Sequence, residues 1–195
     1  MLTKATTGRR RLLDGLAASI AAGGYRATTV ADIVRQARTS RRTFYEHFAD
    51  KEACYVGLLT EANAQMIRQV TAAVDPGAPW QVQVRQAVEA WAACADSGPA
   101  LMHSWIRDVP SLDAQARRLQ RDTLEAFVTM LRTLCDTPRW HAVRAGPVSR
   151  QLAIMLLGGL RELTATTVED GGRVSDITEL AVHACTALLG PTSGP

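Results

Sequence analysis

The chain has 195 residues, of which 47% are hydrophobic and only 5% aromatic, and its formal net charge is +3. This length allows one or two domains with a sizeable core, and the scarcity of alternating β-branched and aromatic residues disfavours a sheet protein. The charge is uneven, because residues 1–51 carry ten Lys and Arg against four Asp and Glu, a net of +6, and the remainder a net of −3. A basic first quarter on a mildly acidic body indicates a polyanionic partner for the first part only.

The first predicted helix spans about residues 8–22 and ends at Gly23 and Gly24, a pair that favours a helix C-terminus. The second begins after Thr29, which forms a T-x-x-D capping box with Asp32. It has room for only two turns before the next break.

The third helix is expected to begin at Ser40, a good N-cap, and it carries Phe44 and Phe48 four residues apart on one face. Asp50 is expected to cap a fourth, much longer helix that continues until the Pro and Gly residues after Asp75.

Five further helical segments follow, separated by segments rich in Gly, Pro and Asp. They span about residues 80–96, 99–109, 111–136, 147–168 and 174–189. The prediction is an all-α fold of about nine helices, with a small N-terminal three-helix domain over residues 1–51 and a larger helical domain over residues 52–195.

The four cysteines are far apart in the sequence and form no C-x-x-C pair; they are Cys54, Cys94, Cys135 and Cys185. Such spacing is typical of neither a disulfide framework nor a metal site, so we expect no metal, no other cofactor and a reducing cytoplasmic location. The longest strongly apolar run after the first helix, residues 152–160, is half the length that a bilayer requires. We therefore expect no membrane partner.

Two short helices joined by a short turn in a basic segment are typical of a helix-turn-helix. The second of them would present its N-terminal residues to base edges in a major groove. Arg41 and Arg42 can bond guanine, Thr43 can contact a thymine methyl group and Tyr45 can bond a phosphate. The alternative is the solvated face of an ordinary helix.

The segment TTVADIVRQARTSRRTFYEHFADKEACYVGLL, residues 28–59, resembles the DNA-binding domain of the TetR family of bacterial transcriptional regulators. The shared motifs are T-T before the second helix, T-F-Y-x-H-F in the third and D-K-E-A at the start of the fourth. The resemblance implies phosphate contacts by one group of residues, Thr29, Tyr45, His47 and Lys51. It implies approach to the bases by another group, Ser40, Arg41, Arg42 and Thr43.

One position departs from the family pattern, in which the turn usually reads Ala-Gly-Val-Ser. Here Arg38 stands at the place of the glycine. Glycine accepts positive φ at no steric cost, so we expect either strain at Arg38 or a locally different turn, and we add Arg38 to the candidate phosphate contacts. His47 could instead cap or solvate its helix, and the run Arg9–Arg11 could be either a solvated end or an arm that contacts DNA.

The resemblance also implies that residues 1–51 are a helix-turn-helix DNA-binding domain and residues 52–195 a ligand-binding and dimerisation domain. It implies a homodimer formed through the last two helices. These helices carry apolar stripes that include Leu152, Met155, Leu156, Gly159, Leu163, Leu180, Ala184 and Leu188. The alternative for these stripes is the core of a single chain. The resemblance further implies a pocket for a small apolar or aromatic effector, with candidate residues Trp91, Met102, His103, Trp105, Phe127 and Met130, for which ordinary core packing is the alternative.

Together these features predict a ligand-responsive regulator that binds a near-palindromic operator as a dimer and leaves it when the effector binds. A repressor is expected by analogy with the family alone. The rival function is a helical protein-interaction module without sequence-specific DNA binding. An enzyme is not expected, because no Gly-rich phosphate loop, G-x-S-x-G or H-E-x-x-H motif occurs and the four histidines are scattered.

Overall fold

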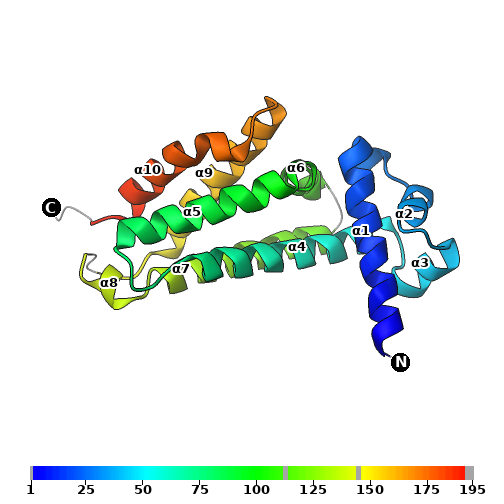
Figure 1. Cartoon of the computed structure of the whole chain (residues 1–195), viewed down its shortest axis with the longest axis horizontal. Coiled ribbons are helices and arrows are strands. Elements are labelled where there is room, and N and C mark those ends of the chain that lie inside the picture. Colours follow the sequence, from blue (N-terminus) through cyan, green and yellow to red (C-terminus); the bar gives the residue numbers. More distant parts are fainter. Residues whose placement is uncertain (1, 112–113, 144–145, 192–195) are drawn as a thin grey trace. The chain divides into compact units, whose positions relative to one another are not determined.

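The computed structural model describes residues 2–111, 114–143 and 146–191, and every regular element in these ranges is a helix (Figure 1). In chain order the elements are α1 (Leu2–Ala27), α2 (Val30–Gln36), α3 (Arg41–His47), α4 (Lys51–Ala73), α5 (Trp80–Ser97), α6 (Pro99–Arg107), the 3₁₀ turn η1 (Val109–Ser111), α7 (Ala114–Leu134), α8 (Pro138–His141), α9 (Arg150–Glu169), the 3₁₀ turn η2 (Val174–Ile177) and α10 (Thr178–Leu189). The predicted all-α fold is confirmed. Helix α8, a single turn that begins at Pro138, was not predicted from the sequence.

The chain divides into two compact units. The first comprises Met1–Asn63 with Ala100–Gln120, and the second comprises Ala64–Pro99 with Arg121–Pro195. Helices α4 and α7 each contribute residues to both units. The functional boundary that we placed between residues 51 and 52 stays a prediction.

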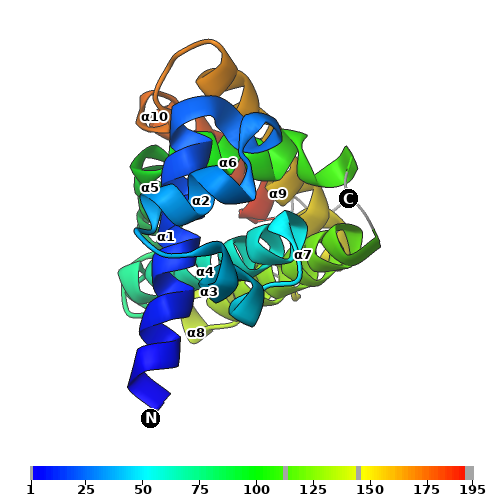
Figure 2. The same cartoon turned by 90° about the vertical axis from the view of Figure 1, so that its right-hand side faces the viewer.

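Helices α1, α2 and α3 contact one another in the first unit (Figure 2). Their shared core includes Leu12, Leu16, Ile33 and Phe44, all fully buried. The predicted helix end at the Gly pair is visible as a break, because Gly24 has φ 79° and ψ 163° near the end of α1. A positive φ of this size is one that glycine adopts readily.

The predicted helix starts are confirmed by their capping bonds. At α2 the Thr29 hydroxyl accepts from the Asp32 amide, and the Asp32 carboxylate accepts from the Thr29 amide at 3.0 Å. The Ser40 hydroxyl accepts from the Thr43 amide at the start of α3. The Asp50 carboxylate accepts from the Ala53 amide at 2.7 Å and so caps α4.

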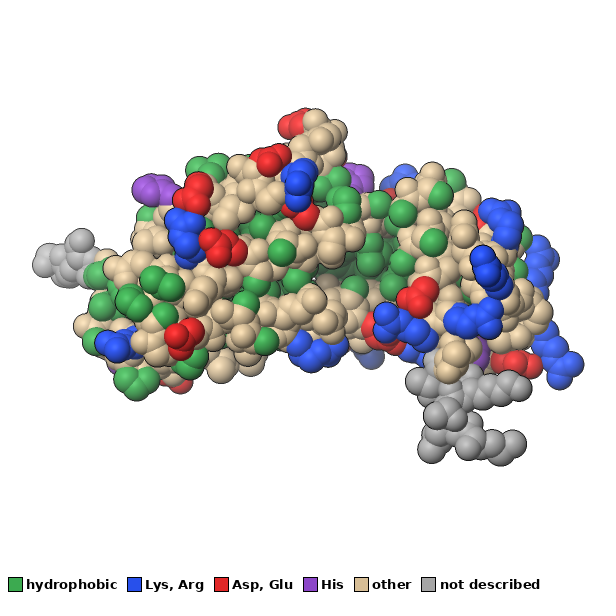
Figure 3. Space-filling view, viewed as in Figure 1, with side chains coloured by type: hydrophobic (Ala, Val, Ile, Leu, Met, Phe, Trp, Pro, Cys, Tyr) green, Lys and Arg blue, Asp and Glu red, His purple; other side chains and the backbone are tan. Residues whose placement is uncertain are grey.

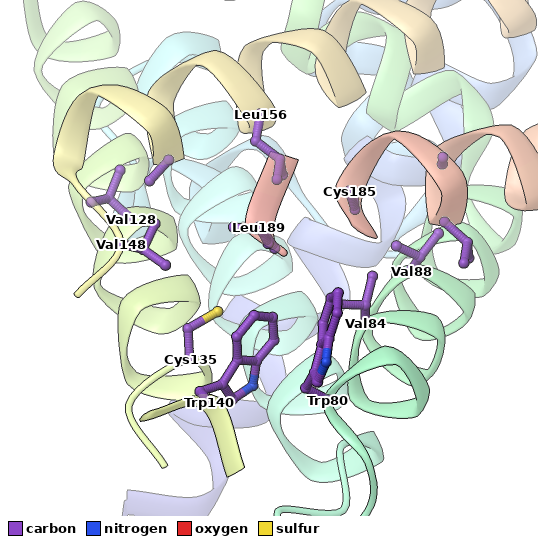
Figure 4. Packing of buried hydrophobic residues seen from close by; sticks show 13 residues of the cluster. Trp80, Val84, Val88, Val128, Cys135, Trp140, Val148, Leu156, Cys185 and Leu189 are labelled. Atoms are coloured by element: carbon purple, nitrogen blue, oxygen red, sulfur yellow. The ribbon is translucent and has the colours of Figure 1, made fainter. Parts of the chain in front are cut away.

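The second unit has its own core, which gathers apolar side chains from five helices (Figure 4). Trp80 of α5 and Trp140 of α8 lie together at one end of it, with ring centroids 5.3 Å apart. The Trp140 indole donates to the buried Gln83 side-chain carbonyl at 3.0 Å. The Gln83 amide in turn donates to the Ala78 carbonyl at 2.8 Å, so these buried polar groups satisfy one another.

Candidate nucleic-acid interface

Helix α3 has one face in the core and one in solvent. Phe44 is fully buried and Phe48, just after the helix, is 7% exposed. Arg41 and Arg42 are exposed, and Tyr45 is 59% exposed, the largest fraction among the large hydrophobic side chains described as exposed. Aromatic groups on the inner face therefore fix the helix, and the outer face presents arginines and a phenol.

Most polar side chains on the outer face of α3 are exposed to solvent, and the ion pair made there by Arg42 is weak. Arg42 pairs with Glu46 at 3.2 Å, but its side chain is 90% exposed, and a pair so exposed contributes little to stability. The Ser40 and Thr43 hydroxyls lie 3.0 Å apart at the start of the helix. Figure 3 shows Lys and Arg side chains gathered over the part of the chain that contains α1, α2 and α3.

The turn before α3 contains the one non-glycine residue with positive φ in the described part of the chain, Arg38, at φ 49°. The Thr39 amide donates to Val34 O at 2.9 Å, and the Arg38 amide donates to Arg35 O at 3.2 Å. This is the Schellman arrangement that ends many helices, with Arg38 at the position that glycine usually occupies. Of the two expectations for this turn, strain at Arg38 is the one that the structure shows, at a cost of about 1–2 kcal/mol relative to an ordinary residue conformation.

The other candidate phosphate contacts differ in the exposure of their side chains and in the hydrogen bonds that they already make. Thr29 is exposed while it caps α2. Lys51 is half-buried, its ammonium donates to Tyr25 O at 3.0 Å and to Thr28 O at 2.9 Å, and burial lowers its pKa. His47 is half-buried beside Gly8, where an added Cβ would lie 3.0 Å from His47 Nε2.

Each arginine of the N-terminal triplet has a partner inside the first unit. Arg9 bonds Glu61, and its guanidinium lies over the Phe48 ring. Arg10 bonds Asp14 at 3.0 Å on the surface of α1. Arg11 donates to two carbonyls of the turn before α3, which the sequence could not indicate because 26 residues separate Arg11 from the nearer one.

A second polar network joins α1 and α4 to α6 within the first unit. The Tyr25 and Tyr55 rings stack with centroids 4.0 Å apart, and the Tyr55 hydroxyl lies 2.6 Å from that of Ser104. Ser104 also donates to Asp108 at 2.9 Å, and Asp108 accepts from Arg26 at 3.0 Å. Burial is the main cause that raises the pKa of both phenols, so both stay neutral.

The candidate effector residues are divided between the two units. Met102 and His103, both half-buried, and the buried Trp105 lie on α6 in the first unit. Trp91, Phe127 and Met130, all half-buried, lie in the second. A groove of about 440 Å³ runs between α4 and α7 of the second unit, and Met130 is the one candidate residue that lines it; the other lining residues are Ile67, Thr71, Glu125, Ala126, Thr129, Thr133 and Leu134.

The candidate dimer residues include three of the five large hydrophobic side chains described as exposed: Met155 at 57%, Leu180 at 56% and Leu188 at 38%. Gly159 is also exposed, and Leu152, Leu163 and Ala184 are half-buried. Leu156 differs from the others, because it is only 6% exposed and packs in the core of the second unit. For Leu156 the structure therefore favours the core alternative.

Two other features bear on function. No helix among the described residues is long and apolar enough to span a membrane. Within the same residues, no group of three or more His, Cys, Asp or Glu side chains is arranged to hold a metal ion.

Residues 12–58 match the model of the family described as bacterial regulatory proteins, tetR family. The match covers the helices α2 and α3, the turn with Arg38 and parts of α1 and α4, and it confirms the resemblance that the sequence motifs indicated. No curated protein matches the chain.

Solved structures extend the similarity to the whole fold. The fatty acid degradation regulator FadR from Bacillus halodurans has a TM-score of 0.78 at 16% identity, with 96% of this chain and 97% of that chain covered. NemR from E. coli in its reduced form has a TM-score of 0.77 at 16% identity, with 96% and 100% covered. FadR from Bacillus subtilis, solved with stearoyl-CoA, has a TM-score of 0.75 at 15% identity, with 89% and 95% covered. At these identities the likeness shows a shared fold.

Proposed function

We propose that this chain, which carries the DNA-binding domain of the tetR family and the fold of its regulators, is an effector-responsive transcriptional regulator that binds a near-palindromic operator as a homodimer. The observation that carries the proposal is the division of α3 into a buried aromatic face and an exposed face with Arg41, Arg42 and Tyr45. Arginine can bond guanine bidentately in a major groove, and a tyrosine hydroxyl can bond phosphate. Repression is the mode that we propose, by analogy with the family.

Apolar exposure on α9 and α10 supports the dimer. Met155, Leu180 and Leu188 lie on these two helices, which contact each other. Gly158 and Gly159 are exposed in the middle of α9, and a Cβ added at either would meet nothing within 4 Å in the chain. Each glycine lowers helix stability by about 1 kcal/mol relative to alanine in a helix interior. Close packing of a second copy against α9 would explain why glycine occupies these two positions.

The groove between α4 and α7 supports a small-molecule effector. Its volume of about 440 Å³ lies in the range of about 300–1,000 Å³ that small-molecule sites occupy. Its lining is apolar at Ile67, Met130 and Leu134, with hydroxyls from threonines and a carboxylate from Glu125. An effector with an apolar chain and a few hydrogen-bonding groups fits this lining best. Stearoyl-CoA is a rational first probe, because FadR from Bacillus subtilis was solved with it.

Helix α4 is the element that we propose transmits effector binding to the DNA-binding domain. Its first half carries Tyr55, which bonds Ser104 of α6 and stacks on Tyr25 of α1. Its second half carries Ile67 and Thr71 of the groove. A coupling of a few kcal/mol between two dimer conformations is enough to lower DNA affinity by one to two orders of magnitude.

The first test is recovery of a preferred duplex from a random pool, followed by affinity measurements on that duplex and on a scrambled one across salt concentrations. We expect preference for the selected duplex and a steep loss of affinity with salt. Tyr45→Ala should weaken binding to both duplexes, whereas Arg42→Ala should mainly reduce the preference between them. Weak binding without preference or salt dependence would instead favour the helical protein-interaction module.

The effector is tested on the same selected duplex by adding stearoyl-CoA. Release of DNA from the unsubstituted protein would support the coupling. A smaller release from Thr129→Trp, whose bulky side chain would fill part of the groove, would support the site. The exposed Thr60→Trp on α4 is a matched control that lies outside the groove lining. Tight binding of stearoyl-CoA with unchanged DNA affinity would contradict the coupling.

A further inference from the structure

The geometry points to Arg11 as a positioning residue for α3, an inference that rests on the proposed DNA-binding function. Arg11 lies on α1 and does not belong to the helix-turn-helix itself. Its Nη2 donates to Ala37 O and to Arg38 O, both at 2.6 Å. Through these two bonds α1 holds the turn that sets where α3 begins.

The two carbonyls need a donor for a reason that lies in the turn. The Schellman bonds from Thr39 and Arg38 satisfy the carbonyls of Val34 and Arg35. Neither bond involves the carbonyls of Ala37 and Arg38 further along the turn, and these two accept from Arg11. Because these carbonyls follow the C-terminus of α2, they also lie at the negative end of its dipole, which a guanidinium cation complements.

The approach of α1 to this turn is unusually close. A Cβ added at Gly15 would lie 2.7 Å from Ile33 O and 2.9 Å from the Ala37 amide nitrogen, distances that no side chain tolerates. Gly15 is four residues after Arg11, so both lie on the same face of α1. The missing side chain at Gly15 lets the backbones approach, and Arg11 then reaches over the turn.

The two hydrogen bonds from Arg11 matter because Arg38 does not by itself favour the positive φ that this turn requires. At φ 49° Arg38 occupies a region that disfavours non-glycine residues, so its conformation must be fixed by its surroundings. Ser40, the N-cap of α3, follows only two residues later. If the turn relaxed, the base-contacting residues at the start of α3 would shift together.

The experiment compares Arg11→Met with Arg10→Met. Both remove one positive charge from the same turn of α1 and keep an unbranched apolar stem. Arg10 makes an exposed pair with Asp14 and does not contact the helix-turn-helix turn. Amide hydrogen exchange of residues 37–43 reports on the turn without DNA, and affinity for the pool-selected duplex and its scrambled version reports on α3.

We expect Arg11→Met to speed exchange in residues 37–43 about tenfold and to weaken binding to the selected duplex about tenfold, since two hydrogen bonds are lost. The salt dependence should equal that of Arg10→Met. Adding Arg38→Gly to Arg11→Met should recover at least half of the lost affinity on a logarithmic scale, because glycine holds the positive φ unaided. A role in overall stability alone would instead speed exchange throughout the chain, not only in residues 37–43.

Two results would overturn the inference. One is unchanged exchange in residues 37–43 of Arg11→Met. The other is a salt slope that falls by about one on both duplexes for Arg11→Met but not for Arg10→Met, which would make Arg11 a phosphate contact. If no duplex is preferred even by the unsubstituted protein, the proposed function fails, and the exchange measurement still decides whether Arg11 holds the turn.

Discussion

The hydroxyl groups of Tyr55 on α4 and Ser104 on α6 lie 2.6 Å apart and are buried. Tyr55 is fully buried and Ser104 is 2% exposed, so neither hydroxyl can exchange its partner for water. The Ser104 hydroxyl donates a hydrogen bond to the Asp108 carboxylate, which also accepts one from Arg26 near the end of α1. The buried members of this network, Tyr55 and Ser104, contribute to stability only when each keeps its partner.

Tyr55→Phe is therefore expected to lower the free energy of unfolding by about 1–2 kcal/mol, since it removes a hydrogen bond and leaves the Ser104 hydroxyl buried with one partner fewer. Denaturant unfolding measures the change. Tyr45→Phe is the matched control, because Tyr45 is 59% exposed and loses only a solvated hydroxyl. Equal stability of the two variants would contradict the importance of the network.

The adjacent residues Phe44 and Tyr45 should separate folding from DNA binding. Phe44→Ala removes a fully buried ring and should lower the free energy of unfolding by about 3–5 kcal/mol. Tyr45→Ala should change it by less than about 1.5 kcal/mol, because the ring is 59% exposed and packs only edge-on against Phe44. Thermal unfolding of both variants beside DNA binding tests the division, and a large loss of stability in Tyr45→Ala would contradict it.

Local signals predicted much of the first unit, because capping residues and helical periodicity act over a few positions. Thr29, Ser40 and Asp50 each mark a helix start that the structure bears out. The partners of Arg11 and of Tyr55 were invisible, since each contact joins residues that are remote in the chain. Such contacts depend on how helices pack, and one sequence does not encode that packing in a local pattern.

The apolar residues of the later helices illustrate the same limit. Periodicity showed that α9 has an apolar stripe, but it could not separate Leu156, which packs in the core, from Met155, which is 57% exposed. Adjacent positions on a helix differ by about 100°, so a broad stripe contains both inward and outward residues. The groove between α4 and α7 was missed for a related reason, because threonines line it beside the apolar residues.

The start of α2 should be sensitive to acid through Asp32. Bonds from the Thr29 hydroxyl and amide hold the pKa of this carboxyl below its ordinary value, and Arg35 adds to the effect. A lowered folded pKa means that the stabilisation is complete above the ordinary carboxyl pKa and is lost as pH falls through the folded pKa.

The measurement is the difference in unfolding midpoint between the unsubstituted protein and Asp32→Asn, taken at about pH 6 and at about pH 2.5. We expect the unsubstituted protein to be more stable at the higher pH and the difference to shrink at the lower one. Thr29→Ala should reduce the difference at the higher pH as well, because it removes the hydroxyl that bonds the carboxylate. A difference that is independent of pH would show that the charge of Asp32 does not contribute.

Gly159 offers a test of the proposed dimer in which folding and association change in opposite directions. A Cβ at this exposed position of α9 meets nothing within the chain, so Gly159→Ala should raise the stability of the single chain by about 0.5–1 kcal/mol through helix propensity. If a second copy packs closely against α9, the same methyl group should weaken dimerisation. Sedimentation across protein concentration measures association, and chemical unfolding at concentrations below the dimer Kd measures the single chain.

Gly98, half-buried at the C-terminal cap of α5, is a control position outside α9, and a Cβ there also meets nothing within 4 Å. Gly98→Ala should leave association unchanged. Met155→Glu, which puts a charge on a side chain that is 57% exposed, should dissociate the dimer while the chain stays folded. If neither Gly159→Ala nor Met155→Glu changed the sedimentation, any dimer interface would lie elsewhere than on α9. Packing between copies would then not explain the exposed glycines.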